Sequence, residues 1–367
     1  MASDQTTTEK PSAPRVSVVI PSYNSEKYVA EAITSITSQT FSDLEVIVVD
    51  GDSTDTTPRI VEEIAARDSR VRLERQAHTG IVDGRNRGAE LARGEYLAWL
   101  DADDVALPRR LEHQVRFLDG HPDVAAVGAS IVVTDLHLRG HLRVTYPLES
   151  AQIAAMLPEA NVLATSATTL RLAAFRAVGG CRPAFKQGAE DYDVWLRLAE
   201  RHRLANLPEV LAYYRQHPNQ ASFPGVERFI LPTVAAQLSA RARRSGRPDP
   251  YGDIDRFTYE WFAEVEPSRS ALDHAVLHAA AGQATYLALI GEPETAQALL
   301  DWAVTATAAT DIARATRARE RLATGITAWQ SHRRPAAVAA ALQAAALDPM
   351  RFGRMLLRGV RARARLG

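Results

Sequence analysis

The chain has 367 residues, of which 46% are hydrophobic and 24% charged, and its formal net charge is −1. This composition is that of a globular protein with a sizeable core, and the near-zero charge argues against a general nucleic-acid binder. The single cysteine, Cys181, excludes an internal disulfide and favours a reducing compartment. The polar start lacks the apolar segment of a signal peptide, and no run of about 18 apolar residues predicts a membrane span. We therefore expect a cytoplasmic protein that binds no nucleic acid.

Short apolar segments alternate with helical segments over the first hundred residues. The predicted strands are 16–20, 44–49, 71–74 and 96–100, and the predicted helices between them are about 26–38, 57–68 and 85–92. Alternation of this kind implies parallel strands joined by right-handed crossovers. The sequence therefore predicts a doubly wound α/β domain.

The composition changes near residue 225, after which the chain is rich in Ala, Leu and Arg and is predicted to be helical. We expect a disordered tail at 1–14, an α/β domain at 15–225 and a helical C-terminal domain at 226–367. The stretches 291–300 and 334–342 are weakly similar to helical-hairpin repeats, but two copies are too few for a solenoid. A helical bundle appended to the first domain is the preferred interpretation.

The end of the chain carries arginines at alternating steps of three and four residues: Arg351, Arg354, Arg358, Arg361 and Arg365. On a helix these side chains form one basic stripe beside apolar residues. The pattern suits either peripheral contact with an anionic membrane, at its inner face, or a solvated helix end. The sequence leaves homo-oligomer formation open.

A cluster of carboxylates, Asp101 to Asp104, directly follows the apolar segment 96–100. Three acidic side chains at the end of a buried strand repel one another unless a cation is present. Ligands of open α/β sheets bind at the carboxyl ends of the strands, and Mg²⁺ or Mn²⁺ prefers one or two carboxylates with phosphate oxygens. We predict a metal site for a phosphate-bearing substrate; a solvated turn, or an N-cap of the helix that follows, is the alternative.

Polar groups also follow the first two strands. The first ends in Pro21 to Asn24 rather than in a glycine-rich loop, which argues against a nicotinamide-dependent Rossmann enzyme. Tyr23 could stack on a nucleobase or simply close the edge of the sheet. The second strand ends in Asp50 to Asp55, whose carboxylates could bind a base or ribose, while Asp55 is placed to cap the next helix. Arg85 could bind a diphosphate or form a surface ion pair.

Taken in order, these segments resemble the inverting glycosyltransferases of family 2, which have the GT-A fold. The resemblance covers about residues 15–218. Its motifs are Val18–Asn24, Ser38–Asp50, Ser53–Asp55, Gly84–Gly88, Gly94–Asp104, Val178–Gly180, Gly188–Leu198 and Tyr214–Pro218. It implies a GT-A-type doubly wound, mostly parallel sheet with an α-helical C-terminal extension. The chain departs from the family in placing Gly51 between Asp50 and Asp52, so the carboxylate that reads the base stays open.

The resemblance also implies roles for individual residues. Asp191 would be the general base supported by Glu190, and Asp101, Asp103 and His217 would hold Mn²⁺ or Mg²⁺. The donor-binding residues would be Pro21, Tyr23, Asp50, Asp52, Arg85, Asp101, Ala102 and Arg215. Cys181 stands where the family often has an aromatic residue. The acceptor pocket, expected between about 130 and 190, has no chemical signature beyond Thr165 to Thr168.

The chemistry of the reaction supports this assignment. A nucleotide-sugar loses a diphosphate, whose charge a cation stabilises, and the attacking hydroxyl needs a base to take its proton. Asp191 opens a helix whose apolar residues Val194, Trp195 and Leu198 are predicted to face inward. Helix capping is the alternative role for Glu190 and Asp191, since carboxylates stabilise a helix N-terminus.

We therefore expect a family 2 glycosyltransferase that transfers a sugar from a nucleotide-diphospho-sugar, most simply a UDP-sugar, to a hydroxyl acceptor. The acceptor could be a cell-surface polysaccharide, a glycolipid or a natural product. A sugar nucleotidyltransferase is the alternative enzyme, although it normally has a glycine-rich basic loop after the first strand. A non-catalytic scaffold whose helical extension binds partners is the alternative outside enzymes.

Overall fold

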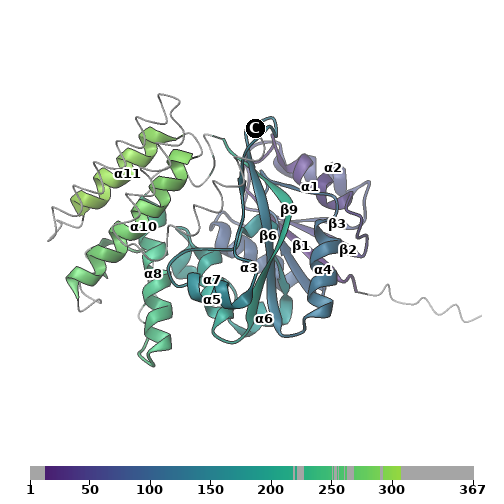
Figure 1. Cartoon of the computed structure of the whole chain (residues 1–367). Helices are drawn as coiled ribbons and strands as arrows, with labels where there is room; N and C mark the ends of the chain where they lie inside the picture. Colours follow the sequence, from purple (N-terminus) through teal and green to yellow (C-terminus); the bar gives the residue numbers. More distant parts are fainter. Residues whose placement is uncertain are drawn as a thin grey trace, which may run out of the picture.

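Figure 1 shows the computed structural model of the chain. It describes residues 13–306 except 218–219, 221–226, 250, 252–253, 255, 260, 263–267 and 290–291. The stretch 334–342, the basic C-terminal segment and residues 1–12 of the expected tail lie outside the described residues. Within them, no helix combines the length and apolar character that crossing a membrane requires.

Nine strands form one sheet: β1 (Val16–Ser22), β2 (Leu44–Asp50), β3 (Val71–Arg75), β4 (Tyr96–Trp99), β5 (Val105–Ala106), β6 (Val124–Thr134), β7 (Gly140–Val144), β8 (Thr169–Arg171) and β9 (Arg203–Arg215). Their order is β3-β2-β1-β4-β8-β6-β9-β5, with β7 paired to β6. The strands β1 to β4 pair in parallel, as do β6 and β9, while β8 is antiparallel to both of its neighbours. The predicted fold class is confirmed.

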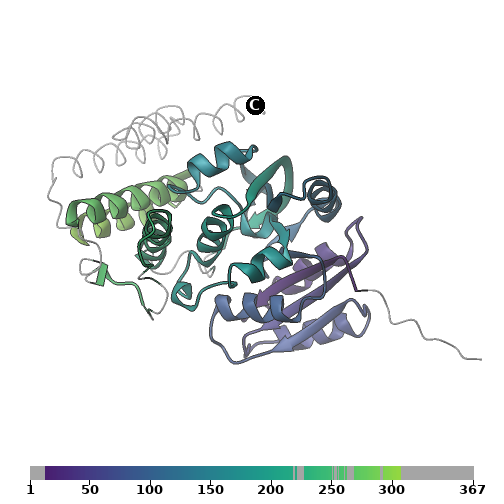
Figure 2. The ribbon, with the colours of Figure 1, turned by 90° about the horizontal axis from the view of Figure 1, so that it is seen from below.

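Helices cover both faces of the sheet (Figures 1 and 2). They are α1 (Val29–Thr37), α2 (Thr57–Ala65), α3 (Ile81–Leu91), α4 (Arg110–Gly120), α5 (Ser150–Met156), α6 (Leu172–Ala177), α7 (Glu190–Ala199), α8 (Glu227–Arg244), α10 (Arg269–Leu289) and α11 (Pro293–Ala306), with short 3₁₀ helices η1 (Thr165–Ala167) and η2 (Pro183–Phe185). The alternation of side chains along each strand fixes this arrangement. Val18 and Ile20 of β1 pack with α1, whereas Val19 faces α3.

The structure corrects the predicted start of one helix. α3 begins at Ile81, four residues before the predicted start at Arg85. Gly84 and Gly88 lower the helix propensity of this segment, so the sequence gives no clear sign of the first helical turn. Gly88 is needed for packing, because a Cβ there would lie 2.3 Å from a methyl group of Val19 on β1. The glycine therefore lets α3 approach the sheet closely.

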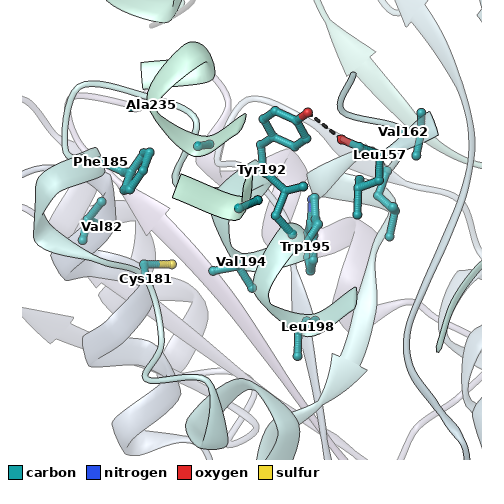
Figure 3. Close-up of a cluster of buried hydrophobic side chains, with 14 of the residues drawn as sticks. Val82, Leu157, Val162, Cys181, Phe185, Tyr192, Val194, Trp195, Leu198 and Ala235 are labelled. Carbon is teal, nitrogen blue, oxygen red and sulfur yellow. Dashed lines mark hydrogen bonds between the residues drawn. The ribbon is translucent and has the colours of Figure 1, made fainter. Parts of the chain in front are cut away.

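The helix α7 is fixed in the core by its apolar residues (Figure 3). Val194, Trp195 and Leu198 are fully buried, which confirms the predicted inward face. The hydroxyl of Tyr192 donates a hydrogen bond of 2.6 Å to the carbonyl of Leu157. The first turn of α7 is thus joined to the segment that follows α5.

The substitution Tyr192→Phe should lower the free energy of unfolding by about 1–3 kcal/mol, because it leaves the buried carbonyl of Leu157 without this donor. Urea denaturation measures the effect. Tyr213→Phe on β9 is a matched control, since the Tyr213 hydroxyl makes no hydrogen bond within the described part of the chain. Equal stability of the two variants would contradict the prediction.

The C-terminal helices continue the core of the sheet. α8, α10 and α11 lie together beside α7, on the side of the molecule away from β3 (Figures 1 and 2). One hydrophobic cluster includes Trp99 of β4, Trp195 of α7, Val234 of α8 and Leu299 of α11. Arg182 adds a polar link, because it pairs with Asp193 on α7 and donates a hydrogen bond of 2.8 Å to Asp249. The expected helical segment after residue 225 is confirmed for the described residues.

Candidate functional site

An aromatic pair lies at the rim of the sheet, in the loops that follow β1 and β3. Tyr23, which follows β1, is 46% exposed, and its ring stacks on His78 with centroids 3.8 Å apart and an interplanar angle of 28°. A nucleobase could extend this stack. His78 was not among the predicted site residues. The signal for it in the sequence is its position in the loop that follows the third strand, two residues before Gly80, whose φ is +102°.

The two aspartates after β2 are arranged differently from each other. Asp50 is fully buried, and its carboxylate accepts hydrogen bonds from the Ser53 hydroxyl at 2.5 Å and from the Ser53 amide at 3.0 Å. Asp52 adopts φ +60° and its side chain is 71% exposed, 3.5 Å from Arg75. Asp50 therefore shapes this loop and Asp52 faces solvent; base reading by either remains a prediction. Asp55 accepts the Thr57 amide at the start of α2, although the N-cap residue itself is Thr56.

The acidic loop after β4 presents its three carboxylates in three directions. Asp101 accepts a hydrogen bond of 2.9 Å from Arg85, and Asp103 Oδ2 lies 2.9 Å from His217 Nε2. Asp104 points into the protein, where it is 1% exposed and accepts the backbone amide of Arg215 at 2.9 Å. Burial, together with the charges of Asp103 and Asp101, raises the pKa of Asp104 well above its usual value. The loop thus offers Asp101 and Asp103 to a ligand.

Two arginines predicted to bind the donor are largely occupied by protein partners. Arg85 is buried, its guanidinium lies 4.9 Å from the centre of the Trp99 ring, and it pairs with both Asp101 and Glu190. Arg215 donates to the carbonyls of Asp103 and Leu136 and pairs with Glu31. Arg85 therefore joins the acidic loop after β4 to the start of α7. Direct contact of either arginine with a diphosphate remains a prediction.

Pro21 and Ala102 are the two apolar residues among the predicted donor contacts. They belong to β1 and to the acidic loop after β4. Pro21 lies within β1, and a Cβ on Gly84 of α3 would be 3.3 Å from its own Cβ. Ala102 is 6% exposed and separates Asp101 from Asp103.

Asp191 stands at the start of α7. Its Oδ2 accepts hydrogen bonds from the Thr165 hydroxyl and, at 3.2 Å, from the Asn161 amide, while Oδ1 accepts the backbone amide of Tyr192 at 2.6 Å. Asn161 was not singled out from the sequence, because a lone Asn in a loop carries no pattern. Glu190, the neighbour of Asp191, points inward to Arg85.

Burial raises the pKa of Glu190 to about 7, although the Arg85 charge opposes this shift. A carboxyl whose pKa is higher in the folded protein binds its proton more tightly there than in the unfolded chain. The contribution of Glu190 to the free energy of unfolding is therefore complete below about pH 4.5 and is lost as the pH rises to about 7.

Glu190→Gln should remove this dependence. Between pH 4.5 and 7.5, the unfolding free energy of the unmodified protein should fall more than that of the variant, by on the order of 1–3 kcal/mol. Urea titrations across this range measure the difference between the two slopes. Parallel slopes would show that Glu190 ionises at a similar pH in both states.

The residues around Asp103 fit a divalent cation bound to a diphosphate. Among the residues that the structure describes, no three His, Cys, Asp or Glu side chains converge as a complete metal site. Mg²⁺ and Mn²⁺ in phosphate-transfer sites, however, use one or two carboxylates and take their other ligands from phosphate and water. Asp103, whose side chain is 28% exposed, and the buried His217, with Asp101 in the same loop, supply oxygen and imidazole donors of the right kind.

Comparison with known proteins agrees with this geometry. The family model for "Glycosyl transferase family 2" matches residues 17–179. A Haemophilus influenzae protein named as an uncharacterized glycosyltransferase is 32% identical over 218 residues, which cover 57% of this chain and 68% of that protein. EpsE of Bacillus subtilis, which also carries a glycosyltransferase name, is 34% identical over 215 residues, covering 56% of this chain and 74% of EpsE.

Solved structures support the same fold. S. aureus TarS residues 1–349, in complex with UDP-GlcNAc, is 17% identical with a TM-score of 0.52, and the match covers 92% of this chain and 93% of TarS. The mannosyltransferase PcManGT from Pyrobaculum calidifontis, in complex with GDP-Man and Mn²⁺, is 22% identical with a TM-score of 0.50, covering 92% and 88%. At these identities the likeness shows only that the fold is shared. The curated relatives and the family model show which sequence family the chain belongs to. The chain belongs to glycosyltransferase family 2 and is a glycosyltransferase of the GT-A fold.

Proposed function

We propose that the protein is an inverting glycosyltransferase that uses a nucleotide-diphospho-sugar and a divalent cation. The observation that carries this proposal is the convergence of two acidic elements at one rim of the sheet. The loop that bears Asp101 and Asp103 and the start of α7, which bears Asp191, are held together by Arg85, which pairs with Asp101 and Glu190. A metal-side carboxylate pair and a candidate base thus lie in one constellation.

In the proposed reaction, the Asp191 carboxylate takes the proton of the acceptor hydroxyl. The acceptor oxygen forms a bond to the anomeric carbon while the bond from that carbon to the diphosphate oxygen breaks, and the electron pair leaves with the nucleoside diphosphate. Attack from the opposite face in one step inverts the anomeric centre. A bound Mn²⁺ or Mg²⁺, held by Asp101, Asp103 and His217, would stabilise the charge that develops on the leaving group.

The nucleotide would lie over Tyr23 and His78, with Asp50 and Asp52 in the adjacent loop. The bound ligands in the TarS and PcManGT structures are UDP-GlcNAc and GDP-Man, so both uridine and guanosine donors should be included in a test. A UDP-sugar is our first choice of donor. The division into a transferase domain at 15–225 and a helical domain at 226–367 remains part of the proposal.

A donor screen tests this function. The protein is incubated with Mn²⁺ and a panel of UDP-, GDP- and dTDP-sugars, and nucleotide release is measured with and without candidate hydroxyl acceptors. We expect release from one donor class, its loss with EDTA, and its loss in Asp191→Asn. No nucleotide binding and no release from any donor would contradict the proposal and favour a non-catalytic scaffold. Release of pyrophosphate from a nucleoside triphosphate and a sugar phosphate would instead identify a nucleotidyltransferase.

A further inference from the structure

The short helix η1 lies between the two halves of the site and makes a hydrogen bond to each of them through consecutive hydroxyl groups. The hydroxyl of Thr165 donates to Oδ2 of Asp191. The hydroxyl of Ser166 accepts a hydrogen bond of 3.1 Å from the backbone amide of Asp101. One residue therefore touches the candidate base, and the next holds the acidic loop.

Two side chains of α4 hold the backbone that follows Thr165 and Ser166 by hydrogen bonds. Gln114 donates a hydrogen bond of 2.7 Å to the carbonyl of Ala167, and Arg110 donates one of 2.9 Å to the carbonyl of Thr168. Both side chains are fully buried. A buried amide or guanidinium is costly unless its hydrogen bonds are made, so movement of this segment would be penalised. η1 is thus a rigid point between the acidic loop and α7.

We propose that Thr165 and Ser166 are positioning residues that set the distance between the general base and the donor-binding loop. The inference rests on the proposed function of Asp191 and of the acidic loop. A displacement of about 1 Å between reacting groups can cost 10²-fold in rate, so a fixed spacer between the two halves has a direct effect on turnover. Thr165 orients the carboxylate that receives the proton, whereas Ser166 orients the loop that holds the donor.

The two roles predict losses in different parameters, kcat for Thr165 and nucleotide affinity for Ser166. Thr165→Val should lower kcat roughly 10- to 100-fold with the donor KM unchanged, because it removes a hydrogen bond to a carboxylate. Thr165→Ser, which keeps the hydroxyl, should restore kcat to within about threefold. Ser166→Ala should weaken Mn²⁺-dependent binding of the nucleoside diphosphate about tenfold, because the backbone amide of Asp101 loses its hydrogen-bond acceptor.

The assay uses the full chain and the donor identified by the screen, with calorimetry of UDP and GDP in the presence of Mn²⁺. Thr34→Val on α1 and Ser38→Ala at its C-cap are matched controls, since these hydroxyls donate only to carbonyls of that helix. The controls should match the unmodified protein in both measurements, and the thermal midpoints of all variants should be compared.

Several results would overturn the inference. Unchanged kcat in Thr165→Val, in a protein that Asp191→Asn inactivates, would remove Thr165 from the mechanism while leaving the proposed function intact. Parallel changes of kcat and donor affinity in both variants, following a fall in thermal midpoint, would show a general role in stability. A failure of the unmodified protein to bind either nucleotide or to turn over any donor would instead overturn the proposed function, and the inference with it.

Discussion

Replacement of Asp191 by Asn is expected to lower the rate of sugar transfer by about 10²–10⁴-fold, the usual contribution of a general base, with nucleotide affinity unchanged. Asn has the same shape as Asp and can still accept the backbone amide of Tyr192, so α7 should keep its start. The amide of this Asn cannot take the proton of the attacking hydroxyl at neutral pH. The measurement is the initial rate of transfer at saturating donor, together with calorimetry of the nucleoside diphosphate.

Asp123→Asn is a suitable control for this variant. Asp123 precedes β6, its side chain is 51% exposed, and it pairs with Arg203. Exposed ion pairs of this kind contribute little to stability, so this variant should retain full activity. Transfer by Asp191→Asn at the rate of this control would remove Asp191 from the mechanism and direct attention to Glu190.

The second large effect is expected for Asp103→Asn, which should abolish the increase in nucleotide affinity that Mn²⁺ produces. The variant keeps a side chain of the same size 2.9 Å from His217 but removes the negative charge that a divalent cation requires. Calorimetry of UDP and GDP with and without Mn²⁺ measures the difference. EDTA treatment of the unmodified protein should have the same result, and added Mn²⁺ should reverse it.

Asp83→Asn, a substitution of the same kind on the first turn of α3, provides the comparison for Asp103→Asn. Its response to Mn²⁺ should equal that of the unmodified protein. A metal response that survives in Asp103→Asn would mean that the cation, if used, is held elsewhere, and the proposed assignment of Asp103 and His217 would be wrong.

The strands that build the catalytic rim can be predicted from the sequence because they are buried on both faces. β1, β2 and β4 contain the apolar runs Val18–Ile20, Val46–Val49 and Tyr96–Trp99, and a polar residue follows each run within two positions. The strands β8 and β9 show no such pattern. β8 has three residues, and β9 contains Pro208 and Glu209, so neither has the alternation of a regular strand.

The composition of the site is easier to predict than its internal contacts. Asp101, Asp103 and Asp191 are identifiable because acidic residues at strand ends and helix starts are recognisable in sequence. Nothing in the sequence shows that Arg85 is buried between Asp101 and Glu190, because their separation along the chain is 16 and 105 residues. Asn161 and His78 are missed for the same reason: their roles depend on which loops the fold brings together.

The shared core of the sheet and the C-terminal helices has a consequence for how the chain could be shortened or recombined. Trp195 and Val234 belong to the same cluster, so a cut near residue 225 would leave the outer flank of α7 in water and favour aggregation over an independent transferase. Exchange of the C-terminal helices between relatives would need matched apolar surfaces on α7 and α8. The two parts of this protein should accordingly have diverged as a pair.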